Sequence, residues 1–242
     1  LLMTAAWFAL AHWQAPLWTM LVALAMLALS AKADDNRIEP IAATFGTLAL
    51  VQLVATFVPA PLAEPNALVE GAGAGAGLTS LLRWAGLAPG FALFAWKARS
   101  GNLRRCAWLL TGLFAYGALA QRVPGWTLPI IASAVAVALF AALRWREQAR
   151  DEALMLPFAA AAVLLLGVTG THPADEWARL TGGSDAPASV LALLRWSALL
   201  APALLLALRA RIEALRLTGE VAAVLAGYGA LAQVTPPIVL PL

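Results

Sequence analysis

The sequence has very little charge for its length. Of 242 residues, only 12% are Asp, Glu, Lys or Arg, whereas 62% are hydrophobic. An average soluble domain is roughly a quarter charged. Sixteen bases and thirteen acids are too few to cover a water-soluble body of this size. The composition therefore excludes an ordinary soluble fold and favours a chain whose surroundings are themselves apolar.

Cysteine and recognisable cofactor motifs are also scarce. Cys106 stands alone, so the chain can form no internal disulfide. The glycine-alanine run at residues 71–77 has no preceding strand pattern and no Lys-Ser/Thr pair. Both are needed for a phosphate-binding loop, so the run is typical of a flexible linker instead. We predict no cofactor.

Long apolar runs dominate what is present. A chain that crosses a bilayer must satisfy its own backbone hydrogen bonds, which leaves helices or a closed barrel. The runs are continuous and rich in Ala and Leu rather than alternating, so we predict an all-α polytopic transmembrane bundle with about eight to ten spans. The expected helices are residues 2–12, 16–31, 41–60, 78–98, 106–121, 126–143, 153–170, 190–208 and 217–233, with a tenth beginning at Ile238.

The basic residues are distributed unevenly between the expected loops. Loops after every second helix hold twelve of the sixteen bases, and the intervening loops hold only Arg122 and Arg179. Cytoplasmic loops of membrane proteins carry an excess of Lys and Arg. We therefore place the basic loops in the cytoplasm and the acidic loops, 61–77 and 171–189, on the opposite side. The net charge of +3 reflects topology, and we predict no nucleic-acid partner.

The sequence also resembles itself at an offset of 112 residues. Residues 81–130 align without gaps on residues 193–242 with 21 identities in 50, including LLRW at Leu81 and Leu193 and YGALAQ at Tyr116 and Tyr228. We predict an internal repeat over about 41–130 and 153–242. Each copy would hold four helices, so the two copies would be parallel in the membrane.

Tandem helices rich in Ala, Leu and Trp and joined by short Arg-rich loops resemble a large family of bacterial predicted membrane proteins. This family is catalogued as domain of unknown function 2339, and the resemblance rests on the LLRW and YGALAQ segments and the Arg-rich hairpins. It implies many spans, a bacterial inner membrane and no assigned activity. Because the chain starts and stops within apolar runs, we expect it to be an internal fragment of a longer protein.

Arg83 and Arg195 are the first candidate site residues, since each lies within an expected helix and precedes a tryptophan. A charge within a membrane helix is unfavourable and often functional. Each guanidinium could bind an anionic ligand or lipid headgroup. The alternative is a structural arginine that reaches the interface or pairs with a loop carboxylate, such as Glu64 or Glu176.

Glu64 and Glu176 are the second pair of candidates, each three residues after a proline. They could serve as ligand-binding or catalytic carboxylates, and Asp175 and His172 lie close to Glu176 in the sequence. The spacing does not match a metal site, so we predict no metal. The alternative is that each glutamate is a solvated residue at a helix start.

The leading functional hypothesis is a non-enzymatic, structural or scaffolding membrane protein whose partners are membrane lipids and the rest of its own longer chain. The motivating features are the repeat and the lack of a catalytic cluster. The second hypothesis is a transporter or a lipid- or anion-binding protein that uses Arg83 and Arg195. The third is an outward-facing membrane enzyme that uses the loop carboxylates.

Overall fold

The computed structural model describes an all-α protein. It covers residues 12–35, 37–55, 63–74, 77–144, 149–170, 173–181 and 189–235, which contain ten α-helices, α2 to α11, and no β-sheet. The chain divides into two compact units. Unit 1 comprises residues 1–68 and 72–122, and unit 2 comprises residues 69–71 and 123–242. The two units are described separately.

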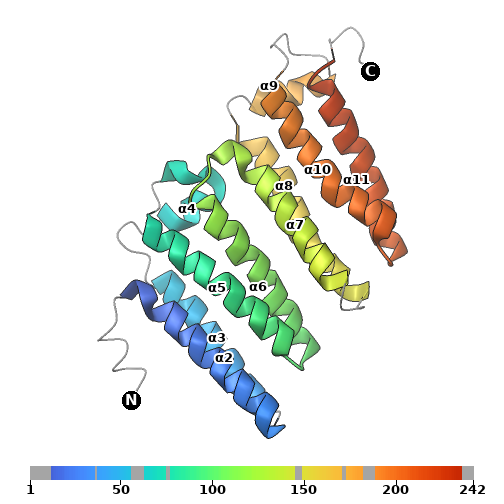
Figure 1. Cartoon of the computed structure of the whole chain (residues 1–242). Helices are drawn as coiled ribbons and strands as arrows, with labels where there is room; N and C mark the ends of the chain where they lie inside the picture. The colour runs from blue at the N-terminus through green and yellow to red at the C-terminus, as the bar shows by residue number, and fades with distance from the viewer. Residues whose placement is uncertain are drawn as a thin grey trace. The chain divides into compact units, whose positions relative to one another are not determined.

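Unit 1 consists of two helical hairpins joined through a short helix. The first hairpin is formed by α2 (Ala15–Ala33) and α3 (Ile38–Ala55), and the second by α5 (Leu78–Lys97) and α6 (Gly101–Ala120). The described part of the connection between them contains α4 (Ala63–Glu70) and the short 3₁₀ helix η2 (Ala72–Ala74). Both hairpin turns lie at one end of the unit and α4 lies at the other (Figure 1).

Unit 2 has the same order of elements. Helices α7 (Leu128–Arg144) and α8 (Leu156–Val168) form one hairpin, and α10 (Val190–Arg209) and α11 (Glu213–Ala232) form the other. The short helix α9 (Pro173–Ala178) lies between them, at the end away from the hairpin turns (Figure 1). The bounds of α10 and α11 are those of α5 and α6 shifted by 112 residues.

Long apolar helices and exposed apolar side chains mark the chain as a membrane protein. Six described helical stretches are long and apolar enough to cross a bilayer, namely Ala15–Ala33, Ile38–Ala55, Leu78–Lys97, Gly125–Arg144, Asp151–Val168 and Val190–Arg209. Large side chains on outer faces are strongly exposed, including Leu164 at 71% and Leu208 at 75%. A soluble protein avoids such extensive apolar surface, whereas a lipid-facing surface requires it.

Several boundaries differ from the sequence-based expectation. Helices α6 and α11 begin about one turn before residues 106 and 217, so Arg104, Arg105 and Arg216 lie within helices and not in loops. Arginine is a good helix former, and its long side chain reaches polar surroundings from the first turns. Helices α4 and α9 were expected to be loop. The expected helix from Ile238 and all but His12 of the one over 2–12 fall outside the described residues.

Candidate functional site

A buried ion pair lies at the α4 end of unit 1. Arg83 is the sixth residue of α5 and shares a buried helix face with Ser80, Trp84 and Leu87. Its Nη1 donates to Oε1 of Glu64, on α4, over 2.9 Å. Arg83 is 1% exposed and Glu64 is 3% exposed, so the pair is almost completely removed from its surroundings. Such a burial requires further polar partners for both groups.

The surrounding residues supply these partners. Nη2 of Arg83 donates to the Leu53 carbonyl, near the end of α3, over 2.7 Å. The Glu64 carboxylate also accepts from the Ser80 hydroxyl at 2.9 Å and from the Trp84 indole N–H at 3.0 Å. Arg83 and Glu64 thereby connect the end of α3, the short helix α4 and the first turns of α5.

Helix α6 holds the backbone of α4 from another direction. Nε2 of Gln121 donates to the Glu64 carbonyl at 3.3 Å, and the Tyr116 hydroxyl donates to the Leu68 carbonyl at 2.5 Å. Both residues belong to the YGALAQ segment. The glutamine amide and the tyrosine hydroxyl therefore both bond between helices, as polar side chains do in membrane bundles.

Unit 2 repeats the arginine–glutamate pair and the glutamine and tyrosine hydrogen bonds 112 residues later. Arg195 pairs with Glu176 on α9, and its Nη2 donates to the Leu166 carbonyl at 2.9 Å and to the Thr169 carbonyl. Gln233 donates to the Glu176 carbonyl at 3.1 Å. The Tyr228 hydroxyl donates to the carbonyl of Leu180 over 2.7 Å. An addition in this unit is Arg179, which donates to the Gln233 carbonyl over 2.9 Å.

The electrostatic balance at Glu176 depends on its arginine. Burial raises the pKa of the Glu176 carboxyl above its ordinary value, and the Arg195 guanidinium acts in the opposite direction. Without Arg195, this positive charge would no longer oppose the effect of burial on the pKa of Glu176. The Arg195 guanidinium therefore favours the ionised form of Glu176 against the effect of burial.

The structure bears on the alternatives given for the four candidate residues. Arg83 and Arg195 pair with Glu64 and Glu176, as one alternative predicted. The alternative that the glutamates are solvated is wrong, because both are buried, at 3% and 9% exposure. The arginine on the neighbouring helix draws each carboxylate inward. Asp175 is exposed, and His172 lies outside the described residues.

A second pair of buried acids, at the hairpin-turn end, was missed by the sequence analysis. Glu39 is 5% exposed and accepts from the backbone N–H groups of Arg99 and Ser100, at 3.1 and 3.0 Å. In unit 2, Glu152 is fully buried and accepts from the Arg211 N–H at 2.9 Å. Each acid thus satisfies free backbone donors just before α6 or α11. The sequence feature that could have predicted this role is that each glutamate lies close to a basic loop.

In both arginine–glutamate clusters, the charged groups bond to other groups of the same chain. Both terminal nitrogens of each arginine donate to groups of the chain itself. Within the described residues, no group of three or more His, Cys, Asp or Glu side chains is placed to hold a metal. No protein-family model, curated protein or solved structure matches the chain.

Proposed function

We propose that this chain is a structural, non-enzymatic multi-pass membrane protein built from two parallel copies of a four-helix unit. The observation that carries the proposal is the pairing of each intramembrane arginine with a buried glutamate of its own unit. A guanidinium already held by a carboxylate and by carbonyl groups stabilises the fold and offers little to a ligand.

The repeat is part of the same proposal. Its support is the recurrence at a 112-residue offset of Arg83, Glu64, Tyr116 and Gln121 as Arg195, Glu176, Tyr228 and Gln233, each with an equivalent hydrogen bond. Residues that make the same long-range contacts in two units are expected of copies of one ancestral unit. With all four long helices of each unit crossing the bilayer, α6 and α11 included, the two copies have the same orientation in the membrane.

We place the protein in the inner membrane of a bacterium, with the hairpin turns in the cytoplasm and α4 and α9 on the periplasmic side. Lys97 ends α5 and Arg99 lies in the α5–α6 turn; Arg209 ends α10 and Arg211 lies in the α10–α11 turn. This is the charge bias of cytoplasmic loops. The resemblance to the bacterial membrane-protein family catalogued as domain of unknown function 2339 supports the same location.

The two alternative functions have weaker support. An anion that bound Arg83 or Arg195 would have to displace a buried carboxylate, which would then lack its charge partner. An enzyme that used Glu64 or Glu176 would need these carboxylates at an accessible surface. Both are instead enclosed by α5 and α6, or by α10 and α11.

A charge-neutral double substitution distinguishes a structural pair from a ligand-binding arginine. Arg83→Met alone leaves Glu64 buried without its partner and should lower the unfolding free energy in detergent by about 3–5 kcal/mol. Glu64→Met combined with Arg83→Met removes both charges and should restore most of that stability, because apolar replacement of a buried pair is often neutral.

The competing outcome is measured on the same samples. Phosphate and anionic lipid that remain with the purified protein are quantified by mass spectrometry. A structural pair predicts equal amounts for the unmodified chain and the folded double variant. A bound anion that the double variant loses would overturn the proposal and favour the anion-binding function.

A further inference from the structure

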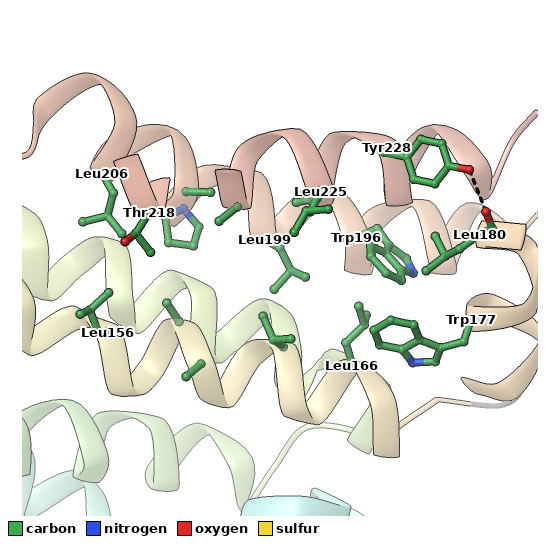
Figure 2. Close-up of a pocket in the computed structure, with 17 residues that line it drawn as sticks. Leu156, Leu166, Trp177, Leu180, Trp196, Leu199, Leu206, Thr218, Leu225 and Tyr228 are labelled. Carbon is green, nitrogen blue, oxygen red and sulfur yellow. Dashed lines mark hydrogen bonds between the residues drawn. The ribbon is translucent and has the colours of Figure 1, made fainter. Parts of the chain in front are cut away.

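An apolar cavity of about 580 Å³ lies inside unit 2, between α8, α10 and α11. Figure 2 shows its long axis following α10, with Leu156 and Leu206 towards one end and Trp177 and Trp196 towards the other. Its volume is within the range of ligand-binding pockets, about 300–1,000 Å³. Nearly all of its lining is aliphatic or aromatic.

The cavity results from small residues that unit 1 does not share. Ala203 and Ala226 line it, and the residues 112 positions earlier are Phe91 and Phe114. In unit 1 these two phenylalanines stack, with ring centroids 5.4 Å apart and planes 5° from parallel. The space that two stacked rings fill in unit 1 is thus left open in unit 2. A third lining residue, Ala222, likewise occupies the position of a leucine in the aligned copy.

The mouth of the cavity is apolar as well. Val163 on α8 and Leu225 on α11 both line it and are 47% and 63% exposed. They belong to the apolar outer surface that a bilayer would cover. Water or a polar solute gains no hydrogen bond from such an entrance, whereas hydrocarbon loses nothing by passing it.

The dimensions suit a linear hydrocarbon chain. Trp196 and Leu206 both line the cavity and are ten residues apart on α10, which corresponds to about 15 Å along the helix. An empty cavity of this size would forfeit dispersion contacts along all of its walls. A hydrocarbon chain from the surrounding bilayer supplies those contacts without ordering a polar group in an apolar space.

We propose that the cavity between α8, α10 and α11 binds one acyl chain of a membrane phospholipid, which enters sideways between Val163 and Leu225. In unit 1, the phenylalanines at the two aligned positions fill the equivalent space. The inference rests on the proposed membrane location, but it does not depend on whether the arginine–glutamate pairs are structural.

Photochemical cross-linking tests the site directly. The full chain is reconstituted in phosphatidylcholine vesicles that contain a small fraction of phosphatidylcholine with a diazirine in one acyl chain. After illumination, labelled residues are mapped by mass spectrometry. We expect labels on inward-facing cavity residues such as Leu199 and Ala203, and loss of the Leu199 label in the variant Ala203→Phe/Ala226→Phe. The matched control Leu204→Phe adds a ring to the exposed side of α10 and should leave the labels unchanged.

A smaller substitution provides a second test in case the double variant does not fold. Ala222→Leu introduces the residue found at the aligned position of unit 1 and should also remove label from the cavity. Labelling of Leu199 that persists in either variant, once that variant is shown to be folded, would overturn the proposal. Absence of label from Leu199 and Ala203 in the unmodified chain would overturn it too, and would indicate that another helix covers the mouth.

A competition arm identifies the source of the chain. Raising the fraction of diazirine phosphatidylcholine in the vesicles should raise the cavity label in proportion, and addition of a free isoprenoid at a constant fraction of probe should leave it unchanged. If the isoprenoid removes the label, the phospholipid assignment is wrong. The Glu64→Met/Arg83→Met variant lies in unit 1 and should retain the cavity label, so failure of the structural proposal and failure of this one are separately visible.

Discussion

Trp84 lies against the bare backbone of Gly117, where a Cβ on the glycine would overlap the indole ring. The same relationship holds between Trp196 and Gly229 in unit 2. In each unit, the glycine allows the last two long helices to approach closely. In unit 1 this approach orients the Trp84 N–H towards the Glu64 carboxylate, 3.0 Å away. Helix packing and the buried ion pair therefore depend on one another.

Gly229→Ala should destabilise unit 2 by about 1–3 kcal/mol, because the added methyl group must displace the Trp196 ring. The measurement is thermal unfolding of the purified chain in detergent. Gly227→Ala is the matched control on the same helix, since its Cβ would meet only a Leu200 methyl group at 3.7 Å. The control should gain up to about 1 kcal/mol from helix propensity. Equal stability of the two variants would contradict the prediction.

Arg195→Met should make the stability of unit 2 fall as the pH rises. Without the guanidinium, burial raises the pKa of Glu176 still further above its unfolded value of about 4.3. A group with a raised folded pKa contributes its full stability below the unfolded pKa and loses it as the pH rises through the folded pKa. We therefore expect a lower Tm at about pH 8 than at about pH 5.

The control for this pH dependence is Glu176→Gln combined with Arg195→Met. The amide does not titrate, so the double variant should show no such decline between the two pH values. If both variants have parallel profiles of Tm against pH, the carboxyl of Glu176 is not the titrating group.

Glu39→Ala should weaken the turn between α5 and α6. The substitution removes the acceptor for the Arg99 and Ser100 N–H groups, at a cost of about 1–2 kcal/mol. Amide hydrogen exchange of these two residues should become faster. Glu39→Gln keeps an acceptor oxygen and should preserve most of the protection. Unchanged exchange in the alanine variant would show that other groups satisfy these donors.

The proposed topology can be tested at two open positions in unit 1. In a Cys106→Ser background, Gly73→Cys and Gly101→Cys place a thiol where nothing lies within 4 Å. In intact bacterial cells, a membrane-impermeant maleimide should label Gly73→Cys, near α4, at once. It should label Gly101→Cys, at the hairpin turn, only after lysis. The reverse pattern would invert the assigned orientation.

The sequence by itself determined the long helices and their apolar character. The expected helices at 78–98 and 190–208 agree with α5 and α10 to within one residue at each end. Such boundaries are local properties: an apolar run must satisfy its own backbone in lipid, and it ends where basic residues begin. The pairing of Arg83 and Arg195 with nearby glutamates was also foreseeable, because a buried guanidinium requires a carboxylate within reach.

Tertiary structure alone decided which acids are buried and where space is left. The Glu64 backbone meets Gln121 across 57 residues, and Glu39 meets Ser100 across 61. Contacts between residues so far apart along the chain leave no periodic pattern in the sequence that would predict them. The cavity lined by Ala203 and Ala226 likewise depends on how α8, α10 and α11 pack together. Packing of distant segments sets burial and volume, whereas local composition sets only the helices that pack.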